Sequence, residues 1–156
     1  MIDIFEDWLH HDVGTVFIQL FEAALASWCH LPASICIYQE LCGSSLILEH
    51  NGDLYSCDHF VEPDFYLGNI HTTPLSELVG QKKQRRFGQA KESSLPKQCR
   101  ECEVRFMCNG GCPKNRFART REGEPGLNYL CEGYRYFFNH CRPFADALAA
   151  LLKVNS

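Results

Sequence analysis

The chain has 156 residues, of which 46% are hydrophobic, and a formal net charge of −4; these values indicate a globular domain and exclude a disordered chain. The negative charge argues against a general nucleic-acid binder, because such proteins are basic over at least one face. The one basic run, at residues 82–86, is interpreted as the solvated side of a helix, with a docking patch as the alternative.

Ten cysteines in so short a chain indicate either the disulfides of a secreted protein or the metal ligands of a cytosolic one. Residues 1–7 are acidic and amphipathic, and they lack the charged start and apolar run of an export signal. No stretch of about 18 consecutive apolar residues is present. We therefore expect a cytoplasmic location, no membrane partner, and thiols that stay available for metal.

Apolar residues fall near helical spacing through residues 2–28, although residues 12–14 (Asp-Val-Gly) interrupt the run. Residues 15–20 fit a buried strand equally well. The segment has many large apolar side chains and no cluster of metal-binding residue types. We therefore expect it to pack on another surface, which can lie outside this chain.

A β-hairpin is predicted around Asn51 and Gly52, a pair that tolerates the positive φ of a tight turn. The segments on either side are interpreted as its two strands. With Asn51 and Gly52 as a two-residue loop, Cys57 pairs with Leu46 and comes close to Cys42, just before the first strand. The hairpin is thus expected to bring distant thiols together.

A helix is predicted from Thr73 towards Phe87. Thr73 is a suitable N-cap residue, Pro74 suits the first helical position, and Glu77 carries the negative charge favoured in a first turn. Gly88 is expected to end the helix, because glycine is common just past a helix terminus.

The remainder of the chain divides into an irregular segment and a closing helix. Residues 96–116 carry cysteines, glycines and charges without periodicity, as expected where metal bonds replace a hydrophobic core. Large apolar residues recur from Gly133 onward and predict a helix. Pro143 is expected to kink or interrupt that helix.

Eight cysteines form a spaced pattern, which reads Cys36-x5-Cys42, Cys57, Cys99-x2-Cys102-x5-Cys108-x3-Cys112-Pro113 and Cys131. Thiolates are the natural ligands of iron–sulfur clusters and of zinc, and four per cluster give two complete sites. Structural zinc would use the same thiols in tetrahedral sets, and disulfides are the third alternative. Cys29 and Cys141 lie outside the pattern and are interpreted as free thiols. The seven histidines are interpreted as non-ligands.

The proline after Cys112 suggests how the thiols are shared, because in two-cluster bacterial ferredoxins the cysteine of a C-x3-C-P ending ligates the other cluster. By that analogy the ligands of the first cluster are Cys36, Cys42, Cys57 and Cys112. The ligands of the second cluster are Cys99, Cys102, Cys108 and Cys131. The two ligand sets are interleaved in the sequence, so the clusters would link the two halves of the chain.

Several ordered segments together resemble the anaerobic sulfatase-maturating enzymes, which are radical S-adenosylmethionine proteins with a carboxy-terminal SPASM domain. The segments that carry the resemblance are Cys36-x5-Cys42, residues 49–61 (EHNGDLYSCDHFV), residues 67–70 (LGNI), the block from Cys99 to Pro113 and residues 126–131 (GLNYLC). They extend over nearly the whole chain and favour iron–sulfur clusters over zinc.

The resemblance implies an α+β fold: a small cluster-stapled SPASM domain with a β-hairpin, short helices and long irregular loops, preceded by a helical or strand remnant of a partial (β/α) barrel. Residues 1–30 would be the end of the radical S-adenosylmethionine barrel and a linker. Residues 31–156 would be the SPASM domain, with the closing helix and two [4Fe–4S] auxiliary clusters on the ligand sets given above.

The resemblance also implies an activity. In the family, a deoxyadenosyl radical removes a hydrogen from the β-carbon of a sulfatase cysteine or serine, which is oxidised to formylglycine. The aspartate directly after the third ligand of the first auxiliary cluster is the general base, and the matching residue here is Asp58. A base beside an electron-accepting cluster couples proton loss to electron loss. Without the resemblance, Asp58 would be interpreted as a hairpin-end residue that bonds to the backbone.

One element of the family pattern is missing, because no Cys-x3-Cys-x2-Cys spacing occurs among the ten cysteines. S-adenosylmethionine and a third [4Fe–4S] cluster are therefore expected in a missing amino-terminal barrel, and the isolated chain is expected to be inactive. Expected partners are that barrel, an unfolded sulfatase segment with the target Cys or Ser, and an external electron carrier such as a ferredoxin or flavodoxin. The alternatives are the SPASM domain of another peptide-modifying radical enzyme, a free-standing electron carrier of ferredoxin type and a zinc-stabilised interaction module.

Overall fold

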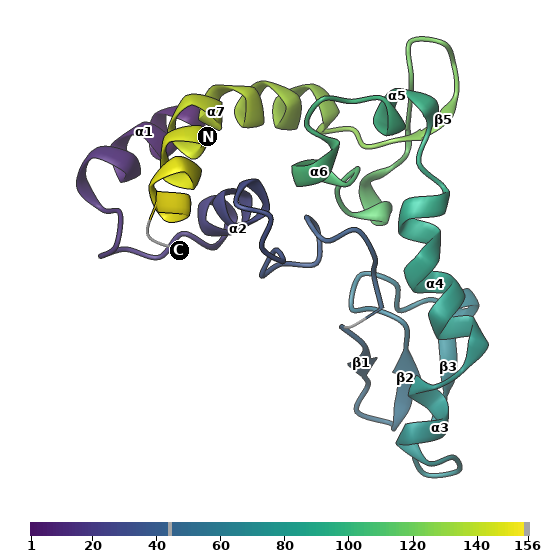
Figure 1. Ribbon diagram of the computed structural model, residues 1–156. Coiled ribbons are helices and arrows are strands. Elements are labelled where there is room, and N and C mark those ends of the chain that lie inside the picture. The colour runs from purple at the N-terminus through teal and green to yellow at the C-terminus, as the bar shows by residue number, and fades with distance from the viewer. Residues whose placement is uncertain (44, 155–156) are drawn as a thin grey trace. The chain divides into compact units, whose positions relative to one another are not determined.

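The computed structural model of the protein describes residues 1–43 and 45–154, apart from the side chains of residues 151–154. The chain divides into two compact units, Met1–Gln39 with Pro96–Ser156 and Glu40–Leu95. Helices and small antiparallel sheets make up both units (Figure 1), which agrees with the predicted α+β class. Among the described helices, none combines the length and the apolar character needed to cross a lipid bilayer.

The first unit contains the two amino-terminal helices and the long carboxy-terminal helix, which are α1 (Ile2–His11), α2 (Gln19–Trp28) and α7 (Cys131–Val154). Its shorter elements are α5 (Lys97–Arg100), α6 (Arg105–Cys108), the 3-10 turn η2 (Pro113–Asn115) and the antiparallel pair β4 (Ala118–Arg119) and β5 (Pro125–Leu127). The short elements follow one another through the cysteine-rich segment.

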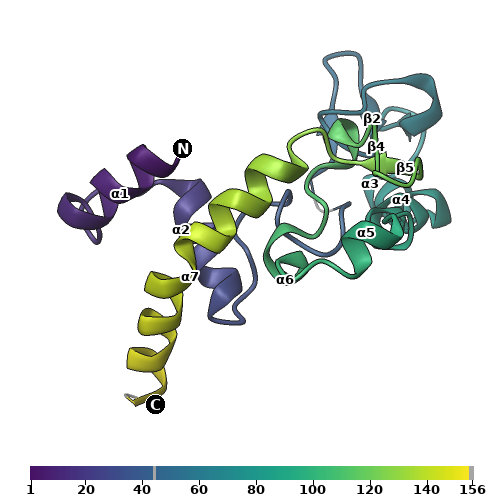
Figure 2. The same cartoon turned by 90° about the horizontal axis from the view of Figure 1, so that it is seen from above.

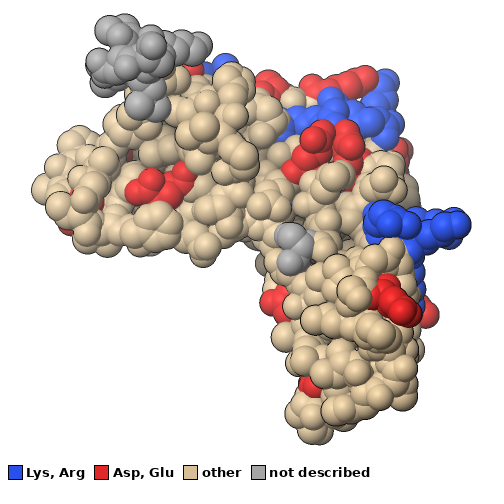
Figure 3. Space-filling view, turned by 60° about the horizontal axis from the view of Figure 1, so that its bottom comes forward, with Lys and Arg blue, Asp and Glu red and all other residues tan. Residues whose placement is uncertain are grey.

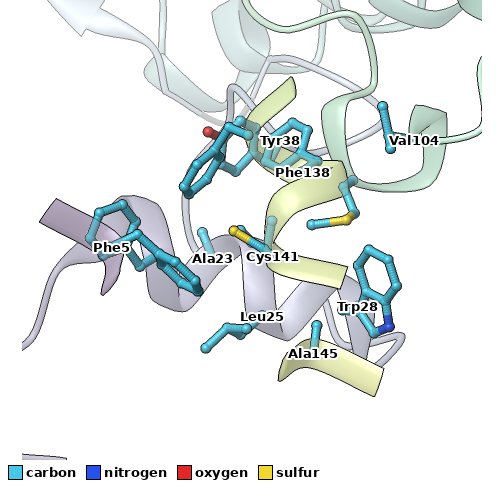
Figure 4. Close-up of a cluster of buried hydrophobic side chains, with 14 of the residues drawn as sticks. Phe5, Ala23, Leu25, Trp28, Tyr38, Val104, Phe138, Cys141 and Ala145 are labelled. Atoms are coloured by element: carbon cyan, nitrogen blue, oxygen red, sulfur yellow. The ribbon is translucent and has the colours of Figure 1, made fainter. Parts of the chain in front are cut away.

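Aromatic side chains from α1, α2 and α7 form the core of this unit (Figure 4). The ring of Phe5 meets those of Phe21 and Phe137 edge to face, at centroid distances of 5.2 and 5.6 Å; such pairs each add about 0.5–1.5 kcal/mol beyond their buried area. Trp28 Nε1 donates a hydrogen bond to Asp146 Oδ1 at 2.8 Å. The amino-terminal segment therefore finds a packing surface inside this chain, on α7, and the strand alternative for residues 15–20 is wrong because α2 begins at Gln19.

The predicted closing helix is confirmed as α7, and Pro143 lies inside it without ending it. Proline has no N–H to donate to the carbonyl group four residues earlier, so a helix that contains it loses a hydrogen bond and bends. Figure 2 shows α7 changing direction along its length. The helix thus begins at a predicted metal ligand, Cys131, and continues into the aromatic core.

The second unit is a three-stranded antiparallel sheet with two helices. The strands are β1 (Ile47–Leu48), β2 (Asp53–Tyr55) and β3 (Tyr66–Asn69), in that spatial order, and the 3-10 turn η1 (Pro63–Phe65) precedes β3. The helices are α3 (Leu75–Val79) and α4 (Lys82–Ser93). Buried Leu54, Leu67 and Leu78 form the described core of this unit.

The predicted hairpin is confirmed, but its predicted register is wrong by one residue. Leu48 lies opposite Leu54, so the loop holds one residue more than a two-residue turn. Gly52 has a φ of 89°, which suits the left-handed last residue of a three-residue loop. The register therefore does not place Cys57 opposite Leu46.

The single helix predicted after Thr73 is two helices, because α3 ends at Val79 and α4 begins at Lys82. Gly88 was expected to end the predicted helix, but it lies in the interior of α4. The reason is close packing: a Cβ atom on Gly88 would lie 2.5 Å from the carbonyl oxygen of Cys42. The glycine lets the loop that carries Cys42 lie directly on the helix backbone.

Candidate metal centre

Four cysteines line one cavity of about 340 Å³ in the first unit, namely Cys99, Cys102, Cys108 and Cys131. They are the four residues that the sequence assigns to the second cluster. Cys99 lies on α5, Cys108 ends α6 and Cys131 is the first residue of α7. Cys102 lies between α5 and α6, so two short helices, the segment that joins them and the start of a long helix present thiols to a common space.

Backbone amides contact two of these sulfurs. The N–H groups of Val104 and Gly110 donate hydrogen bonds to the sulfurs of Cys102 and Cys108. Hydrogen bonds to ligand sulfurs are one of the means by which proteins adjust iron–sulfur clusters. The short α5 and α6 helices, with their turns, thus fix both the thiols and the donors around them.

A tight turn at residues 109–111 separates Cys108 from Cys112. All three turn residues have positive φ, with values of 45°, 71° and 61°. Arg116 Nε and Asn128 Nδ2 donate to the carbonyl oxygen in the middle of the turn at 3.0 and 3.2 Å. Cys112 directly follows this turn, and its assignment to the other cluster stays a prediction.

The environment of the thiols disfavours free thiolates. Burial, together with the neighbouring cysteines, raises the pKa of Cys108 to about 12 and the pKa of Cys131 to about 11. Burial also raises the pKa of Cys99 and of Cys102. A bound metal core supplies the positive charge that makes deprotonation favourable. The donor set therefore fits a metal group held by four thiolates.

The spacing of the thiols bears on the kind of group. Four thiolates around one zinc ion lie about 3.8 Å apart, given the usual zinc–sulfur distance. Among the described residues, no three His, Cys, Asp or Glu side chains converge closely enough to hold a single metal ion. The four thiols line one cavity, and by donor type alone they fit a structural zinc ion as well as an iron–sulfur cluster.

Charged side chains complete the lining of the cavity. The basic ones are Lys97, Arg105, Arg121 and Arg135, and the acidic ones are Glu101, Glu103, Glu122 and Glu132. Figure 3 shows a similar mixing of acidic and basic side chains on one face of the molecule. Since the formal charges around the cavity balance, the charge nearest to each sulfur decides the local electrostatics.

The sequence analysis missed two of these residues that act together. Arg135 Nε donates to Glu103 Oε1 at 2.8 Å, and Glu103 Oε2 lies 3.6 Å from Cys102 Sγ. The hydrogen bond from Arg135 lowers the pKa of Glu103 to about 2. Only their positions in the sequence could have identified them. Glu103 directly follows Cys102, and Arg135 is one helical turn after Cys131.

In the second unit, α4 holds the two segments that carry predicted ligands of the first cluster. Gln84 Nε2 donates to the carbonyl oxygens of Gly43 and Ser56 at 3.0 and 3.3 Å. These residues directly follow Cys42 and directly precede Cys57. Gln84, which is buried, thus links the backbone beside one thiol to the backbone beside the other. Sequence reasoning did not identify it.

Asp58 lies at the exposed end of the β2 segment. Its Oδ1 accepts hydrogen bonds from Cys57 Sγ at 3.1 Å and from the His59 amide at 3.0 Å. The contact with Cys57 is the main cause that lowers the pKa of Asp58. The carboxylate is therefore ionised at neutral pH and lies beside a predicted cluster ligand.

The four ligands predicted for the first cluster come from both units. Cys36 and Cys112 belong to the first unit, and Cys42 and Cys57 belong to the second. Their assignment to one cluster stays a prediction. All ten cysteines lie in the described part of the chain.

Residues 36–103 match the SPASM family, an iron–sulfur cluster-binding domain. The chain is also similar to curated proteins. It is 50% identical over 143 residues to a serine-type anaerobic sulfatase-maturating enzyme of Bacteroides thetaiotaomicron, covering 92% of this chain and 34% of that protein. It is 28% identical over 139 residues to a cysteine-type enzyme of Clostridium perfringens, covering 89% of this chain and 36% of that protein. The chain thus spans about a third of the length of these relatives.

A solved structure described as native anSMEcpe with bound AdoMet and Cp18Cys peptide is similar in fold. Its TM-score is 0.79 at 28% sequence identity, over 95% of this chain and 41% of that chain. The mixed helices and small sheets of the first and second units are therefore arrangements known from a solved relative.

Proposed function

Since the chain is a relative of the anaerobic sulfatase-maturating enzymes and carries a SPASM domain, as its motifs predicted, we propose that it is the auxiliary-cluster and substrate-binding portion of such an enzyme. The complete enzyme would oxidise a cysteine or serine of a sulfatase to formylglycine. This portion would bind the target segment and accept the electron that the substrate radical gives up. It would not act alone, because it has no Cys-x3-Cys-x2-Cys spacing.

The observation that carries the proposal is the cavity lined by four thiols. Cys99, Cys102, Cys108 and Cys131 would hold one [4Fe–4S] cluster. Cys36, Cys42, Cys57 and Cys112 would hold another. When bound, such clusters supply reversible one-electron acceptance. The four-thiol donor set and the N–H groups aimed at two sulfurs support a metal group in this cavity, and the match to an iron–sulfur cluster-binding domain favours clusters over single zinc ions.

Asp58 is proposed as the general base. Loss of the hydroxyl or thiol proton from the substrate radical makes that radical a strong reductant, so a base near an electron acceptor couples the two losses. The Asp58 carboxylate is exposed and ionised, as a base must be before it takes a proton. The His59 amide donates to Asp58 Oδ1 at 3.0 Å, and this contact, which needs no thiol proton, would hold the carboxylate beside the predicted ligand.

A serine target is favoured over a cysteine target. The relative named as serine-type is 50% identical to this chain, whereas the relative named as cysteine-type is 28% identical.

We also propose the remaining parts of the complete enzyme. One is a barrel that binds S-adenosylmethionine and a third [4Fe–4S] cluster, with residues 1–30 as its end, and the other is an external electron carrier such as a ferredoxin or flavodoxin. Residues 31–156 would form the SPASM domain.

The test is the content of iron, acid-labile sulfide and zinc in the chain purified without oxygen. Two four-iron clusters give about eight iron and about eight sulfide per chain and a brown, visible absorption. Zinc without sulfide in a colourless, folded sample would reject the redox function and indicate a zinc-stabilised interaction module.

Two cysteine variants make the test specific. Cys102→Ala is expected to lose about four iron and about four sulfide per chain, because it removes one of four ligands of one cluster. Cys29→Ala is the matched control, since Cys29 follows α2 outside the ligand pattern, and it is expected to keep the full content. Full iron and sulfide in Cys102→Ala would contradict the ligand assignment.

A further inference from the structure

We propose that the ion pair between Glu103 and Arg135 positions the second-cluster ligands and sets the reduction potential of that cluster. The inference rests on the proposed function, because it requires a cluster in the cavity lined by Cys102 and Cys131. Neither Glu103 nor Arg135 is itself a predicted ligand of the cluster.

The ion pair joins the two sides of the cavity. Glu103 follows Cys102 directly, and Arg135 lies one turn along α7 from Cys131. Arg135 Nε and Glu103 Oε1 are 2.8 Å apart. Asn139, one turn further along α7, donates to the same oxygen from Nδ2 at 3.2 Å. The carboxylate of Glu103 is therefore held by two successive turns of the helix that carries Cys131, and the Cys102 segment is held with it.

The carboxylate also lies close to a ligand sulfur. Glu103 Oε2 is 3.6 Å from Cys102 Sγ. When Cys102 is a thiolate in a bound cluster, its sulfur has no proton to donate, and the negative carboxylate then faces a negative ligand. The guanidinium of Arg135 offsets that repulsion. Net charge near a cluster is one of the factors that set its reduction potential.

Replacing Glu103 and replacing Arg135 are therefore expected to shift the reduction potential of the cluster in opposite directions. Glu103→Gln removes a negative charge beside the sulfur, so the potential of the second cluster is expected to become more positive. Arg135→Gln removes the compensating positive charge and leaves Glu103 unpaired, so the potential is expected to become more negative. The double variant Glu103→Gln/Arg135→Gln is expected to fall between the two single variants. A purely structural pair would shift both single variants in the same direction.

The positioning role has its own readout. In Arg135→Gln the Cys102 segment is no longer held to α7, and the chelator-driven release of iron is expected to be about two- to fivefold faster, the factor that corresponds to a partly exposed ion pair. Arg121→Gln is the matched control. Arg121 lines the same cavity and its Nη2 lies 3.8 Å from Glu132 Oε1, but the two side chains are 84% and 69% exposed. Water screens such a pair, so little change is expected.

The experiment is an anaerobic redox titration of the full chain, followed by electron paramagnetic resonance. The signal that disappears in Cys102→Ala identifies the second cluster. The proposal is supported if Glu103→Gln and Arg135→Gln move that signal in opposite directions, each by more than Arg121→Gln does. It is overturned if both move the signal in one direction, or if neither exceeds the control. An unmodified chain without iron and sulfide would instead reject the proposed function itself, so the two failures are distinguishable.

Discussion

Asp58 illustrates how a neighbouring ligand affects the chemistry of one side chain. Its carboxylate accepts a hydrogen bond from Cys57 Sγ, which is the main cause of its lowered pKa while Cys57 is a thiol, and a second one from the His59 amide, which lowers the pKa without needing the thiol proton. A group whose pKa is lowered in the folded state stays ionised as the pH falls through its ordinary range. At neutral pH the carboxylate is thus available to take a proton, which a protonated acid or an amide cannot do.

In the complete maturase, Asp58→Asn is expected to keep the full iron and sulfide content and to lower the rate of aldehyde formation by about 10²- to 10⁴-fold, the usual contribution of a general base. Aldehyde is counted by mass spectrometry of a target peptide. Asp64→Asn is a suitable control, because Asp64 lies nearby in η1 and is exposed. Unchanged turnover in Asp58→Asn would return Asp58 to a structural role at the end of the hairpin.

At the scale of elements, α4 is the helix that places the ligand loops of the second unit. The Cys42 amide donates to the Gly88 carbonyl oxygen at 3.1 Å, and the Cys42 carbonyl oxygen lies against the Cα of the same glycine. Gln84, one turn earlier, donates to the backbone after Cys42 and before Cys57. One face of a single helix therefore sets the positions of two predicted thiolate ligands.

A glycine pair tests this role of α4. Gly88→Ala is expected to lower the free energy of unfolding by about 1–3 kcal/mol, because its Cβ would overlap the Cys42 carbonyl oxygen. Gly133→Ala, in α7, meets no atom within 4 Å and is expected to raise that free energy by about 0.5–1 kcal/mol through helix propensity alone. Urea unfolding of the anaerobic protein measures both. A stabilising Gly88→Ala would show that the loop does not depend on close contact with the helix.

At the scale of the whole molecule, the two units differ in their cores. The described core of the first unit has 15 buried residues, many of them aromatic, whereas that of the second unit has three leucines. Since apolar burial is the main stabilising contribution in a folded domain, we expect the second unit to depend more strongly on the proposed bonds from its thiols to metal.

Removal of the clusters with a chelator is therefore expected to affect the two units unequally. Backbone amides of β1, β2 and β3 should lose their protection from hydrogen exchange, while those of α1, α2 and α7 keep much of theirs. Mass spectrometry of exchange in the loaded and the stripped chain measures this difference. Equal loss of protection in both units would mean that the aromatic core also requires the clusters.

The sequence predicts the hairpin and the closing helix, because both depend on short-range patterns. Residue spacing groups Cys99, Cys102, Cys108 and Cys131, which line one cavity, and turn chemistry places the hairpin at Gly52. The errors have a tertiary origin. The register of the hairpin depends on the exact loop, and Gly88 continues a helix because a distant loop packs on it.

The polar residues around the site were not predicted for a similar reason. Glu103, Arg135 and Gln84 are ordinary charged or polar helix and loop residues in the sequence. Their roles arise only when α7 and α4 lie beside the cysteine segments. The amino-terminal segment was likewise expected to pack on a surface that could lie outside the chain, yet α7, which is more than a hundred residues away in sequence, provides one.

The position of Cys131 at the first residue of α7 has a consequence for biosynthesis. The other three thiols of its cavity leave the ribosome earlier, as a compact run, and can hold a nascent cluster only incompletely. The fourth thiol arrives with the helix whose later turns carry Phe137 and Phe138 into the aromatic core. We therefore expect the proposed metal site to be completed in the same step in which α7 docks on the aromatic core.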